Sequence, residues 1–250
     1  MKKLLTLLFV TILFVSCNKE PYQVSKITAK TNLIDPTIRQ DSTIINEYLP
    51  YKDKMIKEIT RKLSYAPENI VRTDGVLQSS LGNLIADLSY EKANTLFEKE
   101  TGKKVDFSMS NYGGIRAGIM KGKVTVSNAF ELMPFDNTIV VVELTAEKVE
   151  ELFEYFAVKN VANPLSKQVQ IKINRGEYDI TINGKPIDMN RTYFVATSDY
   201  LQKGGDGMNF FVEPESLYKS NFLIRDAIAE YFQSKDTLVA STDKRVMVIR

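Results

Sequence analysis

The segment at residues 110–116 reads Ser-Asn-Tyr-Gly-Gly-Ile-Arg and combines ligand-binding side chains with paired glycines. Gly113 and Gly114 have no Cβ, so the backbone there can approach a ligand closely. Asn111 offers an amide, and Arg116 offers a planar cationic fork suited to carboxylate or phosphate groups. A tight turn with a solvated arginine would use the same residues, so this segment alone leaves both interpretations open.

Two further segments combine turn residues with side chains that could contact a ligand. Residues 132–138 read Leu-Met-Pro-Phe-Asp-Asn-Thr, and Phe135 lies just before a predicted strand. Its ring could face an aromatic ligand or enter the hydrophobic core. Residues 199–207 place three glycines around Asp206, which indicates a backbone with positive φ and a carboxylate at the loop tip. That carboxylate could equally cap its own turn.

The composition excludes several classes of function. The 250 residues include no histidine and one cysteine, Cys17, so the chain has no ligands for a conventional zinc site and no base for a Ser-His-Asp triad. Two-metal phosphoesterase sites that use histidine are excluded too. A carboxylate site for magnesium or calcium stays open, but no clustered acidic spacing argues for one. We therefore expect no cofactor in this chain. The 33 Lys and Arg residues are interspersed with 31 Asp and Glu residues, unlike the basic stripe of a nucleic-acid-binding protein.

The first residues have the pattern of an export signal. Two lysines precede an apolar stretch at residues 4–15, which is too short to span about 30 Å of hydrocarbon as a helix. Its length is typical of the apolar region of a secretory signal. Ser16 and Cys17 then supply the small residue and the cysteine of a lipoprotein signal, although an ordinary cleaved signal with an incidental cysteine is the alternative. We expect a signal peptide at residues 1–16 and an acylated Cys17 that anchors an exported protein to a bacterial membrane.

Hydrophobic periodicity alternates between helical and strand-like patterns along residues 39–250, which we interpret as one domain. The expected fold class is mixed α/β (α+β), with a mixed β-sheet and helices packed on it. Residues 17–38 are expected to form a tether followed by an initial strand at residues 25–31. Helical patterns cover residues 42–63, 81–97, 145–156 and 223–232. Strand-like patterns cover residues 65–72, 105–109, 137–144, 169–173, 178–182, 191–197 and 244–249.

Local signals mark where several of these elements begin and end. Ser79 or Ser80 is placed to cap the helix at residues 81–97, and Thr145 is placed to cap the next helix. An Asn-Gly pair at residues 183–184 predicts a hairpin. Pro50 predicts a break in the first helix or the start of its main segment. The apolar residues that should share one face of that helix are Met55, Ile56, Ile59 and Leu63.

Four motifs in this order resemble the C-terminal domain of the 5′-nucleotidase and UDP-sugar hydrolase family. They are Leu-Gly-Asn-Leu at residues 81–84, Asn-Tyr-Gly-Gly-Ile-Arg at 111–116, Met-Pro-Phe-Asp-Asn-Thr at 133–138 and Gly-Gly-Asp-Gly at 204–207. The similarity runs from about residue 42 to the C-terminus. Four ordered motifs make the resemblance far more specific than any one glycine pair.

The resemblance implies a nucleoside-binding or nucleotide-binding site. Family members hold the base between two aromatic rings, which match Phe135 and Tyr200 here. The asparagine and arginine of the family's glycine loop match Asn111 and Arg116, which would contact polar groups of the ligand. The aspartate that meets the ribose hydroxyls matches Asp206. The glycines expected to line these loops are Gly113, Gly114 and Gly205.

The sequence departs from the family pattern in three places. Tyr112 replaces a usual glycine, which could narrow the pocket, and Tyr200 replaces a common phenylalanine. Gly75 stands where the family often has an arginine, and Arg72 is near but not aligned. The family's arginine contact with the ligand's phosphate or ribose on that side therefore has no aligned residue here.

Complete family enzymes also have an N-terminal metallophosphoesterase domain whose His, Asp and Asn residues hold two metals. The resemblance therefore implies that this chain is the substrate-binding half of a split 5′-nucleotidase in nucleotide catabolism, and is not catalytic alone. A separate exported metallophosphoesterase with divalent metals would be its partner. One alternative is a lipid-anchored nucleoside-binding protein without an enzyme partner. Another is a scaffold whose pocket has decayed.

Overall fold

The computed structural model describes residues 24–174 and 177–249. The predicted signal peptide and Cys17 lie outside the described residues. The chain divides into two compact units, Met1–Tyr48 and Leu49–Arg250, and each is described by itself. In the part of the chain that the structure describes, no helix is long and apolar enough to cross a membrane.

The predicted strand at residues 25–31 is wrong, because residues 24–35 have no regular secondary structure. Val24 and Ile27 are exposed, so these side chains have no packed surface in the structure to hold a strand. A strand is stabilised by a partner whose backbone groups it can pair with, and residues 24–35 pair with none of the described strands.

Helix α2 (Ser42–Ile59) begins after Asp41, whose carboxylate accepts a hydrogen bond from the backbone N–H of Thr43 over 2.8 Å. The helix continues through Pro50, so the predicted break there is wrong. The predicted shared apolar face is wrong for Leu63, which belongs to a strand, and no residue of α2 is buried.

In the described residues of the second unit, two four-stranded sheets and one strand pair form the framework. The central sheet has the order β2 (Phe107–Ser108), β8 (Tyr193–Ser198), β4 (Thr138–Leu144), β9 (Ser216–Leu223). β2 runs parallel to β8, whereas β4 is antiparallel to both of its neighbours. The other sheet has the order β10 (Val246–Ile249), β5 (Val169–Asn174), β6 (Glu177–Ile182), β7 (Lys185–Pro186). β1 (Lys62–Ala66) pairs with β3 (Gly122–Thr125).

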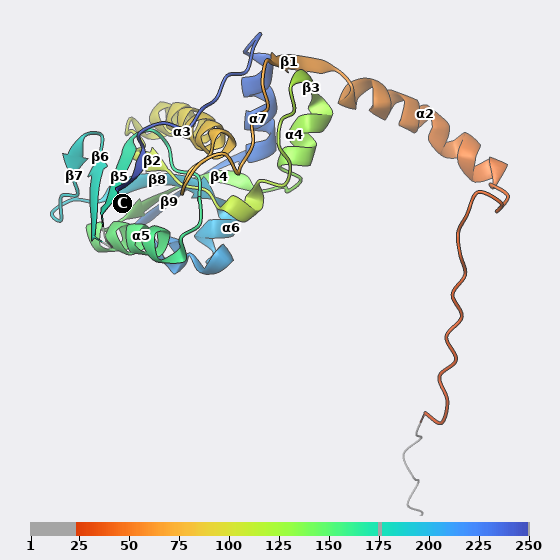
Figure 1. Ribbon diagram of the computed structural model, residues 1–250, viewed down its shortest axis with the longest axis horizontal. Coiled ribbons are helices and arrows are strands. Elements are labelled where there is room, and N and C mark those ends of the chain that lie inside the picture. Colours follow the sequence, from red (N-terminus) through yellow and green to blue (C-terminus); the bar gives the residue numbers. More distant parts are fainter. Residues whose placement is uncertain (1–23, 175–176, 250) are drawn as a thin grey trace, which may run out of the picture. The chain divides into compact units, whose positions relative to one another are not determined.

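Both faces of the central sheet are buried because β4 directs apolar side chains to each face in turn. Ile139 and Val141 join a core cluster with residues of α3 (Ser80–Thr101) and α7 (Ile224–Gln233). Val142 and Leu144 join a second cluster with residues of α5 (Ala146–Lys159). Figure 1 shows α3 and α5 on opposite sides of this sheet. The predicted mixed α/β fold with helices packed on mixed sheets is confirmed.

The predicted caps and the hairpin are confirmed. Ser79 is the N-cap of α3, where its side chain accepts from the backbone N–H of Gly82, and Thr145 caps α5 in the same way. Asn183 and Gly184 both have positive φ, as a type I′ turn requires, and they connect β6 to β7.

The sequence patterns missed several elements and misplaced others. The missed strands and α-helices are β3, α4 (Val126–Leu132), α6 (Asp199–Gln202) and β9, and three short 3-10 helices were missed as well. The strand predicted at residues 65–72 lies earlier, in β1, and the strand predicted at 105–109 is only the two residues of β2. The placement of these elements depends on tertiary contacts more than on local propensity.

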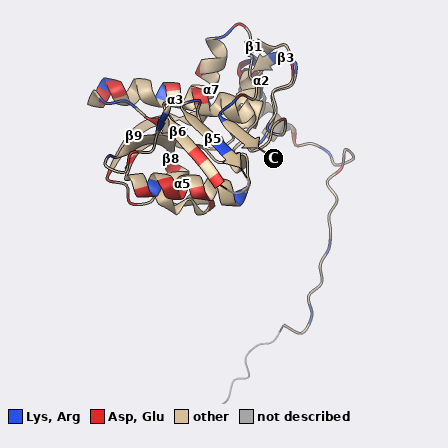
Figure 2. Cartoon of the chain, turned by 60° about the vertical axis from the view of Figure 1, so that its left-hand side comes forward, with Lys and Arg blue, Asp and Glu red and all other residues tan. Residues whose placement is uncertain are grey.

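Charged residues of both signs are interspersed along the described part of the chain (Figure 2). Acidic residues outnumber basic ones on α5, which contains four glutamates against Lys148 and Lys159. This distribution gives no continuous basic stripe of the kind that follows a nucleic-acid backbone.

Candidate functional site

Three loops meet at one end of the central sheet. The glycine loop at residues 110–116 follows β2, and α6 follows β8, which runs parallel to β2. The Phe135 loop precedes β4, whose first residues pair with the last residues of β8 because these strands are antiparallel. The end of β2, the end of β8 and the start of β4 therefore lie at the same edge. The sheet topology brings together segments that are far apart in the sequence.

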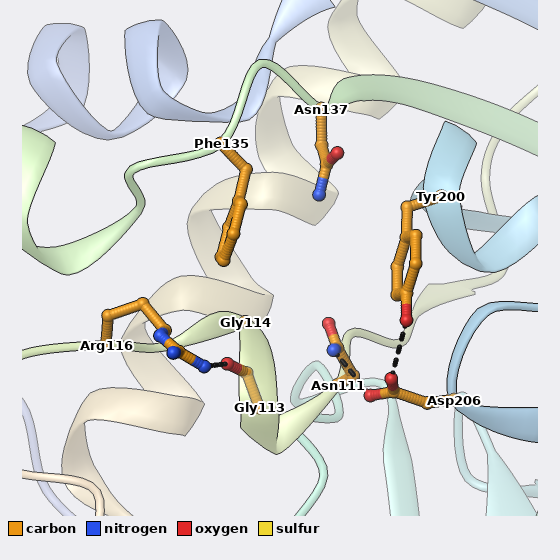
Figure 3. A pocket seen from close by; sticks show the side chains of 8 residues that line it. All are labelled: Asn111, Gly113, Gly114, Arg116, Phe135, Asn137, Tyr200 and Asp206. Atoms are coloured by element: carbon orange, nitrogen blue, oxygen red, sulfur yellow. Dashed lines mark hydrogen bonds between the residues drawn. The ribbon is translucent and has the colours of Figure 1, made fainter. Parts of the chain in front are cut away.

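A pocket of about 270 Å³ opens between these loops, and we call it the ring pocket. Phe135 and Tyr200 approach it from opposite sides, with Asn137 between them (Figure 3). The residues that line the ring pocket are Asn111, Gly113, Gly114, Arg116, Phe135, Asn137, Tyr200 and Asp206. Seven of the eight binding residues expected from the sequence are therefore neighbours in one cavity.

The glycine loop is folded tightly around Asn111. A Cβ on Gly114 would lie 2.8 Å from Oδ1 of Asn111, so only glycine leaves room for this amide. Oδ1 of Asn163 accepts a hydrogen bond from the backbone N–H of Tyr112 over 2.9 Å and holds the loop from the other side. Arg116 is exposed and donates to the carbonyl oxygen of Gly113 over 3.2 Å. Its guanidinium is therefore open to solvent beside the pocket.

Phe135 is not a core residue, because 38% of it is exposed. Its ring lies beside Arg116, with 5.8 Å between the guanidinium carbon and the ring centroid. Asn137 also lines the pocket, and the sequence analysis missed it. The available signal was its place two residues after Phe135, just before a β-branched strand. Its backbone carbonyl accepts from the N–H of Ile224 over 3.0 Å, which fixes the strand entrance.

Asp206 connects two walls of the pocket. Its Oδ1 accepts a hydrogen bond from the hydroxyl of Tyr200 over 2.8 Å, and its Oδ2 accepts from Nδ2 of Asn111 over 2.6 Å. Tyr155 donates from its hydroxyl to the backbone carbonyl of Asp206 over 2.9 Å. The carboxylate thus contacts pocket residues and does not serve only as a cap for its own turn. The hydrogen bond to Asp206 raises the pKa of Tyr200 above its ordinary value.

Gly205 does not line the pocket but lies against the ring of Tyr200. A Cβ at this position would lie 2.5 Å from Cε1 of Tyr200, closer than side chains pack. Tyr200 is 44% exposed, with one side of its ring over this glycine. Gly205 therefore contributes to the site by leaving room for the ring.

Tyr112 and Arg72 contact each other outside the ring pocket. The guanidinium of Arg72 lies over the ring of Tyr112, 4.5 Å from its centroid. Nη1 of Arg72 also donates to the carbonyl oxygen of Ile115 over 2.6 Å. Tyr112 does not line the pocket, so it does not narrow it. Arg72 therefore holds the glycine loop through the carbonyl of Ile115 and the ring of Tyr112.

Within residues 24–174 and 177–249, no group of three or more His, Cys, Asp or Glu side chains is arranged to hold a metal ion. The polar atoms of the ring pocket are one carboxylate, two amides, a phenol and a guanidinium. This set suits hydrogen bonding to a sugar and a base edge, because it combines donors and acceptors around two aromatic faces.

The sequence model of the family described as "5′-nucleotidase, C-terminal domain" matches residues 56–213. The matched range contains all of the residues that line the ring pocket. The chain belongs to this family.

Among characterised relatives, the chain is 30% identical over 214 residues to the trifunctional nucleotide phosphoesterase protein YfkN of Bacillus subtilis, covering 74% of this chain and 14% of that protein. It is 22% identical over 239 residues to the 5′-nucleotidase of Vibrio cholerae, covering 90% of this chain and 41% of the relative. The chain therefore spans less than half the length of these relatives.

Solved structures show the same fold. The 5′-nucleotidase precursor from Thermus thermophilus superposes with a TM-score of 0.67 at 22% identity, over 84% of this chain and 44% of that one. The NAD nucleotidase of Haemophilus influenzae superposes with a TM-score of 0.62 at 18% identity, over 84% of this chain and 42% of the other. These likenesses establish the architecture of the domain.

Proposed function

We propose that the ring pocket binds a nucleoside or nucleotide, with the base between Phe135 and Tyr200. The single observation that carries this proposal is that two exposed aromatic rings, 65 residues apart in the sequence, face one cavity from opposite sides (Figure 3). Stacking of a base on such a ring contributes about 1–3 kcal/mol. The volume of about 270 Å³ is near the lower end for small-molecule sites, which suits a base held between rings with the rest of the ligand open to solvent.

The polar side of the pocket suits a ribose. A carboxylate oxygen has about two lone-pair positions, and each oxygen of Asp206 receives one hydrogen bond from the protein. Acceptor capacity therefore remains for the hydroxyls of a sugar. Arg116 is exposed at the rim of the pocket and would meet an anionic group such as a phosphate.

Hydrolysis is assigned to another domain in this proposal. The sequence has no histidine to complete a two-metal phosphoesterase centre. The family membership supports a role in nucleotide catabolism through phosphate ester hydrolysis. A separate exported metallophosphoesterase would supply the divalent metals and cut the ester while this domain holds the nucleoside. Acylation of Cys17 after removal of residues 1–16 would keep the protein at a bacterial membrane.

The test compares binding with turnover. Isothermal titration should show that adenosine and AMP, which contain a base, bind more tightly than ribose 5-phosphate. Phosphate release from AMP by the chain alone should stay at the background rate with added manganese or magnesium. Addition of an exported metallophosphoesterase encoded beside this protein should raise the rate, and EDTA should abolish turnover without abolishing adenosine binding.

Two outcomes would change the assignment. Robust hydrolysis by the pure chain would refute the division of labour. Binding without any gain in rate from the metallophosphoesterase would favour the lipid-anchored nucleoside-binding protein.

A further inference from the structure

Phe135 lies on a segment that has no regular secondary structure, residues 133–137 between α4 and β4. Backbone hydrogen bonds hold both ends of this segment: Met133 donates to Ala129, and Asn137 accepts from Ile224. A binding group on a loop is positioned less precisely than one on a helix or strand unless other side chains hold it. The middle of the segment, which carries the ring, therefore needs a further contact.

Arg225, the second residue of α7, contacts the middle of this segment. Its Nη2 donates to Oδ1 of Asp136 over 2.8 Å, and its Nη1 donates to the backbone carbonyl of Phe135 over 3.5 Å. Its guanidinium also lies over the ring of Phe130 on α4, 4.3 Å from the centroid. One side chain thus connects α7, α4 and the residue that forms a wall of the ring pocket.

The exposure of the ion pair between Arg225 and Asp136 indicates that this pair contributes little to the stability of the fold. The side chain of Arg225 is 13% exposed, whereas that of its ion-pair partner Asp136 is 82% exposed, so solvent screens the pair. Nε of Arg225 is buried and has no hydrogen-bond partner among the described residues. A buried donor without a partner is unfavourable, and an apolar side chain of similar length would fill the same space without that cost.

We propose that Arg225 is a positioning residue that sets the orientation of Phe135 and so determines affinity for the base of the ligand. Arg225 does not line the ring pocket and acts only through the backbone at Phe135 and the side chain of Asp136. This inference rests on the proposed function of the pocket.

Three variants of the full chain separate positioning from stability. Arg225→Met keeps the bulk of the side chain, Arg225→Lys keeps the charge without the fork, and Asp136→Asn removes the charged acceptor at an exposed position. Arg191→Met is the matched control, because Arg191 also pairs with an aspartate, Asp106, and lies over an aromatic ring, Tyr193, at 4.0 Å. The control lies outside the ring pocket.

Hydrogen exchange measures, in the absence of any ligand, how firmly Arg225 holds the loop at residues 133–137. In the Arg225 variants and in Asp136→Asn, the hydrogen-bonded amides that border the loop, those of Met133 and Thr138, should exchange faster than in the wild type, while the amides of residues 139–144 in β4 keep their protection. The control should leave the exchange of Met133 and Thr138 unchanged. Unchanged exchange in all three variants would overturn the inference even if the pocket binds no nucleoside.

Ligand titration then measures the consequence. The Arg225 variants should bind adenosine about 3- to 10-fold more weakly, since part of the stacking contribution is lost, while affinity for ribose 5-phosphate and the melting temperature stay close to wild type. Equal losses of affinity for adenosine and ribose 5-phosphate, or no loss for either ligand, would contradict a role of Arg225 through Phe135. Failure of the wild type to bind adenosine would instead refute the proposed function, and the exchange experiment would still decide whether Arg225 holds the loop.

Discussion

The hydroxyl of Tyr200 donates a hydrogen bond to Oδ1 of Asp206 over 2.8 Å, while Oδ2 of the same carboxylate accepts from Asn111, 95 residues earlier in the chain. Asp206 has a φ of 55°, in the left-handed region, and glycines flank it on both sides. Its backbone conformation therefore directs one carboxylate toward two walls of the ring pocket. These hydrogen bonds make the orientation of the Tyr200 ring depend on the carboxylate of Asp206.

The ionisation of Tyr200 should report this contact. Asp206 accepts a hydrogen bond from the neutral phenol and repels the phenolate, and both effects raise the pKa of Tyr200. We expect Asp206→Ala to lower the pKa of Tyr200, as measured by NMR titration of 13C-labelled tyrosine. Tyr200→Phe identifies the resonance. An equal pKa of Tyr200 in the wild type and in Asp206→Ala would show that this hydrogen bond is absent in solution.

The same shift predicts how stability depends on pH. Because the pKa of Tyr200 is higher in the folded state than in the unfolded chain, its contribution is fully present below the unfolded value, near pH 10. It is lost as the pH rises through the folded pKa. The difference in unfolding free energy between wild type and Tyr200→Phe should therefore decrease above about pH 10, measured by urea denaturation. A difference in unfolding free energy that grows with pH would contradict a raised pKa of Tyr200 in the folded state.

Removal of either ring should weaken nucleoside binding. Phe135→Ala and Tyr200→Ala should each raise the Kd for adenosine by about 5- to 150-fold, because each removes about 1–3 kcal/mol of stacking. Tyr178→Ala on β6 is a matched control, since Tyr178 is 42% exposed and lies outside the ring pocket. Isothermal titration gives the Kd values. Unchanged affinity in both ring variants would favour a decayed pocket that serves only as a scaffold.

Gly205→Ala should act through Tyr200. The added Cβ would lie 2.5 Å from Cε1 of Tyr200, so the ring must move out of its position. We expect adenosine affinity to fall by about 3- to 30-fold, within the loss expected for removal of the ring. In a Tyr200→Ala background, Gly205→Ala should add no further loss, because the displaced ring is already absent. Additive losses in this cycle would mean that Gly205 contacts the ligand itself.

Membrane attachment should depend on Cys17. We expect Cys17→Ser to abolish incorporation of labelled palmitate and to move the protein from the membrane to the soluble exported fraction, because a serine has no thiol to acylate. Fractionation of cells that express each form measures both effects. A Cys17→Ser protein that remains with the membrane through acyl chains would refute this anchor.

Elements whose signals are local could be predicted from the sequence. Ser79 and Thr145 cap helices through bonds to N–H groups three residues away, so residue type and spacing are sufficient to predict them. The Asn183-Gly184 turn likewise depends on two adjacent residues with positive φ. Strand β9 was missed because its burial pattern is irregular and its place is determined by pairing with β4, which lies more than 70 residues earlier.

Helix α2 shows what hydrophobic periodicity alone does not predict. Met55 and Ile59 are four residues apart, which is a helical spacing, and the helix forms, but α2 has no buried residue. Periodicity shows that apolar residues share a helix face. It does not show what, if anything, covers that face.

For the site, the sequence by itself determined the family and the types of residue that contact the pocket, because the motifs are short and contiguous. Only the tertiary structure decided that Asn137 joins them, that Gly205 serves the ring of Tyr200, and that Arg225 lies behind Phe135. The contacts of Asn137 and Arg225 connect segments that the order of β2, β8, β4 and β9 in the central sheet brings together. Sheet order and strand direction are properties of the whole fold, so no local pattern in the chain encodes them.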